Sequence, residues 1–124
     1  KDKNPLLTFT ARKNSKDEVG YFEVRHAKDS RANKLIEVNL DRFVGKWVLV
    51  KEKIRFGLHG SYYLEIMSIN TGNPIINYKN DTIHMWSENA IFIRPKWGLY
   101  RSLNEKSMMK DEVISYADFY IYRH

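Results

Sequence analysis

Apolar and polar residues alternate in short stretches that turn residues separate, and this alternation constrains the fold more than any other feature. Side chains of a β-strand point to opposite faces in turn, so period-two alternation is typical of strands with one buried face. The pattern predicts strands at residues 6–12, 19–26, 35–40, 47–56, 62–69, 75–78, 91–102 and 112–123. Because no amphipathic helix interrupts them, we predict an all-β fold, an antiparallel β-sandwich, in which residues 1–124 form a single domain or part-domain.

The stretches between these strands carry turn residues or polar runs. Asn70-Thr71-Gly72-Asn73-Pro74 is the strongest hairpin signal in the chain. We predict a second turn at Gly57 to Gly60, a polar loop at residues 28–33, and a longer loop at residues 79–89 that holds His84 and Trp86.

The composition limits the chemistry. The chain carries 21 Lys and Arg against 15 Asp and Glu, a net charge of +6, which attracts polyanions such as acidic polysaccharides, nucleic acids or anionic membranes. There is no cysteine, so disulfides and cysteine metal sites are excluded. The four histidines lie far apart and no glycine-rich phosphate loop is present. We therefore expect no cofactor and no metal site.

Residues 47–56 form the longest predicted strand before the hairpin. One face carries the apolar residues Val48, Val50, Ile54 and Phe56, and the other carries the cations Lys51, Lys53 and Arg55. Such a row of cations is either the solvated face of an antiparallel sheet or the lining of a groove for a polyanion.

The stretch from Ile91 to Ser102 alternates as well. Its core-facing set is Ile91, Ile93, Trp97 and Leu99, and its other face carries Phe92, Arg94, Lys96, Gly98 and Tyr100. In a strand the Cα atoms of Lys96 and Tyr100 would lie about 13 Å apart. Gly98 would leave a bare patch between them that suits a sugar ring with a carboxylate, or it simply marks a bulge. The last stretch would turn Val113, Ala117, Phe119 and Ile121 inward.

The run Lys96-Trp97-Gly98-Leu99-Tyr100-Arg101-Ser102 resembles the late-strand signature of the jelly-roll polysaccharide lyases, the group of heparin lyase I, glucuronan lyase and alginate lyase. Weaker similarities support it along most of the chain: Asn4-Pro5-Leu6-Leu7, Gly45-Lys46-Trp47, the hairpin at residues 62–78, and the closing stretch 113–122 with Asp118. The resemblance implies a concanavalin-A-like jelly roll, of which this chain would be the C-terminal half.

The resemblance also implies a chemistry and a set of site residues. These lyases cleave uronate polymers by β-elimination, so Tyr100 would be the catalytic base and acid. Substrate would be bound by Lys96, Arg94, Arg101 and Gly98, with Lys51, Lys53 and Arg55 as further binding residues. The group also uses an Arg and a Gln-x-His motif, which hold the substrate carboxylate. This sequence contains neither, so we expect a second chain with the N-terminal half of the sandwich to supply them.

Three functions follow from these observations. The leading hypothesis is the C-terminal part of a polysaccharide lyase, secreted or periplasmic, with an acidic polysaccharide as partner. The alternative is a non-catalytic glycan-binding jelly roll. A basic β-domain that binds nucleic acid is third, because no RRM, KH or cold-shock signature is present. No run is long enough for a transmembrane helix, so no membrane partner is expected.

Overall fold

The computed structural model describes residues 5–13, 19–28, 31–87, 90–98, 111 and 113–123. The chain divides into two compact units, Lys1–Ile91 and Phe92–His124. Each unit is described by itself below. That residues 1–124 make one domain or part-domain stays a prediction.

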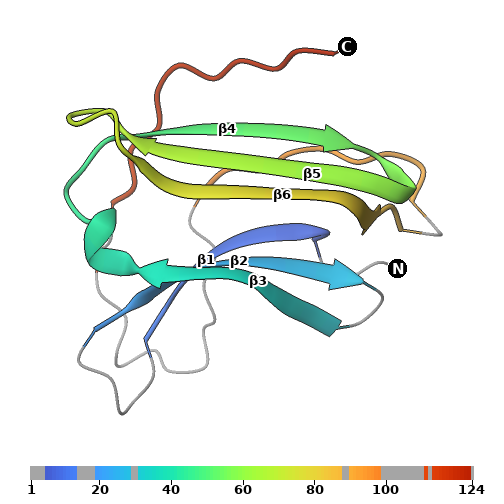
Figure 1. The fold of residues 1–124 in the computed structure, drawn as a ribbon, viewed down its shortest axis with the longest axis horizontal. Coiled ribbons are helices and arrows are strands. Elements are labelled where there is room, and N and C mark those ends of the chain that lie inside the picture. Colours follow the sequence, from blue (N-terminus) through green and yellow to red (C-terminus); the bar gives the residue numbers. More distant parts are fainter. Residues whose placement is uncertain are drawn as a thin grey trace. The chain divides into compact units, whose positions relative to one another are not determined.

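The first unit consists of six strands in two antiparallel sheets (Figure 1). One sheet has the order β1-β2-β3, built from Leu7–Arg12, Tyr21–Lys28 and Arg31–Asn39. The other has the order β4-β5-β6, built from Val48–Arg55, Gly57–Ser68 and Pro74–Met85. A 3₁₀ turn, η1 (Leu40–Arg42), begins the connection between the sheets. The predicted all-β antiparallel sandwich is confirmed.

The core lies between the two sheets. From β5 the alternate residues Tyr62, Leu64 and Ile66 are almost fully buried, and Val24 of β2 belongs to the same cluster. The cluster is completed by Ile76, Ile83 and Met85 of β6. Burying each such side chain contributes about 1.5–3 kcal/mol, so this interface accounts for the pairing of the sheets.

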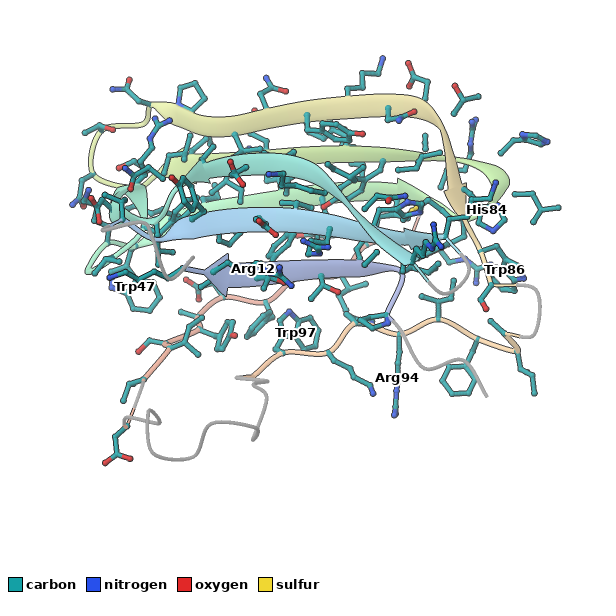
Figure 2. All side chains as sticks on the ribbon, turned by 90° about the horizontal axis from the view of Figure 1, so that it is seen from below. Arg12, Trp47, His84, Trp86, Arg94 and Trp97 are labelled. Atoms are coloured by element: carbon teal, nitrogen blue, oxygen red, sulfur yellow. The ribbon has the colours of Figure 1, made fainter. Side chains whose placement is uncertain are left out.

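A single side chain also ties the sheets together by a hydrogen bond. His26 of β2 is 6% exposed, and its Nε2 lies 2.6 Å from the carbonyl oxygen of His84 on β6. Figure 2 shows His84 and Trp86 at one end of the sandwich and Trp47 at the other.

The hairpin at Asn70 to Pro74 is confirmed. Gly72 has φ +68° and its N–H donates to the Ser68 carbonyl at 2.8 Å, so the turn requires the left-handed backbone that glycine adopts without strain. Since the turn sets the register, Tyr63 of β5 comes to lie opposite Lys79 of β6.

Three predicted boundaries in the first unit are wrong. Residues 57–60 are the start of β5 rather than a turn, residues 31–33 pair with β2, and residues 79–85 continue β6. Polar and small residues fill most of these stretches, because much of their surface meets solvent, where burial does not select apolar side chains. In β5 and β6 register shifts at Gly60 also interrupt the alternation before the buried Ile83 and Met85. Strand β4 lies as predicted, although its apolar face is only partly covered because β4 is an edge strand.

The two remaining strand predictions lie mostly in the second unit and are wrong over the described residues. Neither residues 91–98, which begin at the last residue of the first unit, nor residues 113–123 form a strand. Ile91 is 93% and Val113 91% exposed rather than turned into a core. Period-two alternation shows which face a strand could bury, but a strand forms only with a partner, and the described parts of these two stretches take part in no ladder. Within this unit the Trp97 ring lies 4.6 Å from that of Phe119 between centroids.

Candidate functional site

The residues of the Lys96–Ser102 motif are described only in part. Arg94, Lys96 and Gly98 lie in the described segment 90–98 and are exposed, and the guanidinium carbon of Arg94 lies 5.9 Å from the centroid of the Phe92 ring. Tyr100 and Arg101 lie outside the described residues. The placement of Tyr100 beside Lys96 therefore stays a prediction.

Gly98 has a backbone reason to be glycine. Its φ is +133°, a conformation that residues with a Cβ rarely adopt, and a Cβ added there would meet nothing within 4 Å. Among the described residues the space at Gly98 is open, and the bare patch between Lys96 and Tyr100 stays a prediction. A larger side chain would nevertheless strain the backbone, so substituting Gly98 would not test ligand contact alone.

The cations of β4 lie on the outer face of the β4-β5-β6 sheet. Lys51, Lys53 and Arg55 pair with Glu65, Tyr63 and Ser61 of β5, which alternate with the buried core residues of that strand. Residues that pair across strands share a face, so the three cations point away from the core. The row that the sequence predicted on one side of β4 is present.

This face carries two further residues that sequence reasoning missed as site residues. Tyr63 lies between Lys53 on one neighbouring strand and Lys79 on the other, so the three form one cross-strand row. Tyr63 could have been placed on this face from the sequence, because the predicted hairpin sets the register and the alternation of its two strands sets which side chains point outward. Lys79 was missed because it was assigned to a loop. We call the surface of Lys51, Lys53, Arg55, Tyr63, Glu65 and Lys79 the outer basic face.

Ion pairs compensate only part of the charge on the outer basic face. Lys51 Nζ lies 3.6 Å from a carboxylate oxygen of Glu65, and Lys79 Nζ lies 3.1 Å from one of Asp81. Arg55 donates to two backbone carbonyls, those of His59 at 3.4 Å and Asp81 at 3.3 Å. The guanidinium therefore spans from β4 across β5 to β6.

Lys53 differs from the other cations of this face in having no polar partner within the described ranges. Among the residues that the structure describes, it makes no ion pair or hydrogen bond. A lysine that no carboxylate holds is free to receive an anionic ligand.

Tyr63 is held by its neighbour on the same strand. Its hydroxyl donates to Oε2 of Glu65 at 3.1 Å. Desolvation raises the pKa of the Tyr63 phenol, and the hydrogen bond to Glu65 and the charge of its carboxylate raise it further. Tyr63 thus keeps its proton at neutral pH, and the hydrogen bond holds its side chain toward Glu65.

The β1-β2-β3 sheet carries a charged cluster of a different kind. Glu23 is 7% exposed, and Arg25 holds it at 2.7 Å and Arg12 at 3.6 Å. This arrangement neutralises a buried carboxylate, which would otherwise be costly. His26 on the same strand has its Nε2 engaged with the His84 carbonyl, so it is not available to replace the histidine of a Gln-x-His motif.

Among the described residues, no group of three or more His, Cys, Asp or Glu side chains could hold a metal ion. The same residues include no helix that is long and apolar enough to cross a membrane.

Comparisons of the chain with protein-family models, curated proteins and solved structures find no match. The class that the fold itself defines is a small antiparallel β-sandwich with one basic outer face.

Proposed function

We propose that this chain is the C-terminal part of a polysaccharide lyase that cleaves a uronate-containing anionic polysaccharide by β-elimination. The observation that carries the proposal is the motif from Lys96 to Ser102, with its Lys-x-Gly-x-Tyr spacing. The β-sandwich architecture and the net charge of +6 are compatible with it.

The chemistry needs three kinds of group. The C5 proton of a uronate becomes acidic only when cations or amide donors neutralise the neighbouring carboxylate. A base then removes that proton, a C4=C5 double bond forms, the C4–O bond breaks, and an acid protonates the leaving oxygen. Tyr100 takes both proton-transfer roles in this proposal, with Lys96, Arg94 and Arg101 as the cations whose charge favours its phenolate.

The carboxylate-neutralising Arg and Gln-x-His of the lyase group are missing from this sequence. We therefore assign them to a second polypeptide that completes the sandwich, and we assign the enzyme to a secreted or periplasmic location, where acidic polysaccharides are met. By this proposal residues 1–124 alone are inactive.

The test follows the unsaturated uronate that β-elimination forms, by its ultraviolet absorbance, on a panel of uronate polymers. Residues 1–124 are assayed alone and with a polypeptide that carries the Arg and Gln-x-His strands. Tyr100→Phe should lower the rate of the completed enzyme about 10²- to 10⁴-fold with little change in glycan binding. Tyr116→Phe, a tyrosine outside the motif, is the control. A Tyr100→Phe enzyme with the full rate would contradict the assignment.

The second candidate function is a non-catalytic glycan-binding β-sandwich. The outer basic face favours it, because an uncompensated Lys53 beside the fixed ring of Tyr63 can bind without any chemistry. Binding of uronate polymers without the unsaturated product, in the completed protein as well, would select this candidate. Binding of single-stranded DNA in preference to all of them would instead select a nucleic-acid-binding domain.

A further inference from the structure

We propose that the outer basic face holds a binding site for one ring of an acidic polysaccharide, centred on Tyr63 between Lys53 and Lys79. The three residues are direct cross-strand neighbours on β4, β5 and β6. Neighbouring strands lie about 4.8 Å apart, so the Cα atoms of the two lysines are about 10 Å apart with the tyrosine midway between them. Two flexible cations thus flank one aromatic ring on an open sheet face.

The hydrogen bond of Tyr63 fixes how its ring lies. Glu65, which accepts from the hydroxyl at 3.1 Å, stands two residues further along the same strand and on the same face. To reach it, the ring must lean along the strand over about 7 Å instead of standing upright. One face of the ring is then presented outward, and a pyranose ring packs its apolar C–H face on such a surface. Because the ring is already held, little rotamer entropy is lost on binding.

The charges on the outer basic face suit a polyanion that also carries hydroxyl groups. Lys53 has no partner among the described residues, and it meets a carboxylate or sulfate group of the ligand. Glu65 and Asp81 are acceptors that sugar hydroxyls can approach. These carboxylates repel the anionic groups of either polymer, but a DNA backbone offers no hydroxyl donors that could hydrogen-bond to them, and a sugar ring does. The chemistry therefore favours an acidic polysaccharide over a nucleic acid.

This inference rests on the proposed function for its class of ligand, but it uses none of the residues of the Lys96–Ser102 motif. Strands β4, β5 and β6 all belong to the first unit of the chain. The site adds affinity for the polymer and takes no part in proton transfer, so its test reads binding without turnover.

The experiment measures the affinity of residues 1–124 by calorimetry. The probes are hexasaccharides of polyglucuronate and of heparin, with single-stranded DNA hexanucleotide as the competing class. Tyr63→Ala should weaken hexasaccharide binding about tenfold, the size of ring stacking on an aromatic side chain. Lys53→Gln should weaken it about threefold, the size of one exposed ion pair. Tyr63→Phe keeps the ring but loses the hydrogen bond to Glu65 that holds it, so it should weaken binding only about threefold, less than Tyr63→Ala does.

Lys28→Gln is the matched control, since it removes the same charge from an exposed lysine of β2 on the other sheet. Thermal unfolding of each variant shows whether the sandwich is intact, and the exposed Lys53→Gln keeps the test decisive if Tyr63→Ala unfolds. Hexasaccharide binding that responds to Lys53→Gln and Lys28→Gln alike would overturn the site but leave the proposed function standing. An absence of any hexasaccharide binding, or tighter binding of DNA, would also overturn the site, whereas the proposed function fails only if the completed enzyme forms no unsaturated uronate.

Discussion

Tyr62 and Tyr63 are adjacent in sequence, and the pleat of β5 gives them opposite environments. Tyr62 is fully buried in the sandwich core, and its hydroxyl donates to Oε1 of Glu52 at 2.6 Å. Tyr63 turns to the outer basic face. The same side chain is therefore part of the core at one position and part of the proposed glycan site at the next.

Tyr62→Phe should lower the free energy of unfolding by about 1–2 kcal/mol, because it removes a hydrogen bond to a charged acceptor and keeps the buried ring. Urea denaturation at pH 7 measures this loss. Tyr120→Phe, at an exposed position in the second unit, is the control and should change nothing measurable. Equal stabilities of Tyr62→Phe and the wild type would mean that water replaces the hydroxyl at Glu52 without cost.

The same tyrosine should make the fold sensitive to alkali. Burial raises the pKa of Tyr62, and the nearby Glu52 carboxylate raises it further. The folded chain therefore holds this proton more tightly than the unfolded chain, whose phenol ionises near pH 10. The contribution of Tyr62 to stability is complete below about pH 10 and is lost as the pH rises above it, by at most about 1.4 kcal/mol per pH unit.

Unfolding measured from pH 9 to pH 11.5 checks this linkage. The stability of the wild type should fall more steeply above pH 10 than that of Tyr62→Phe, so the difference between the two should shrink. Parallel curves would show that the other tyrosines and the lysines dominate the alkaline range.

At the scale of elements, the sequence predicted strands well where one face is buried or a turn has a distinct signature. The Asn70–Pro74 hairpin and β4 were found for these reasons. The β6 extension at residues 79–85 was not, because residues 79–82 are polar and the ladder shifts register before the buried Ile83 and Met85, so no continuous period-two signal runs through it. Residues 91–98 have the pattern of a strand but no ladder, and alternation says nothing about a pairing partner.

The candidate site could be predicted from the sequence only in part. The cations of β4 could be placed on one face from period two alone. Their neighbours Tyr63 and Lys79 depend on the register across three strands, which the hairpin sets and a single strand does not reveal. Residues that become neighbours only across paired strands therefore cannot be found from the sequence pattern of a single strand.

The start of β5 yields a prediction at this scale. Gly60 belongs to an irregular stretch of the β5–β6 ladder, and a Cβ there would lie 2.3 Å from the Arg55 carbonyl oxygen and 2.8 Å from Met85 Cβ. Because backbone cannot move aside cheaply, Gly60→Ala should cost about 2–3 kcal/mol. Thermal unfolding measures it.

Gly72→Ala separates this steric effect from backbone strain. Gly72 has φ +68° with nothing within 4 Å of an added Cβ, so its substitution should cost only about 1 kcal/mol. A Gly60→Ala loss no larger than that of Gly72→Ala would show that β5 relaxes away from Arg55.

At the scale of the whole molecule, the first unit contains the buried core, and the second unit contains the proposed catalytic residue. All residues of the buried core cluster lie between Val24 and Met85, and so do all residues of the outer basic face. The proposed catalytic Tyr100 belongs to the second unit, whose described apolar residues are largely exposed. The first unit thus contains the core cluster and the proposed glycan site, and it lacks the proposed base.

The chain shortened to residues 1–91 should therefore keep a cooperative thermal transition within a few degrees of that of residues 1–124, because its core is intact. It should also bind the polyglucuronate hexasaccharide within about twofold of the full chain, since Lys53, Tyr63 and Lys79 remain. When completed by a polypeptide with the Arg and Gln-x-His strands, it should form no unsaturated uronate.

Tyr63→Ala in the shortened chain should weaken binding as it does in the full chain. A shortened chain that folds but no longer binds would move the glycan site to residues 92–124, and one that fails to fold would show that the second unit covers part of the sandwich.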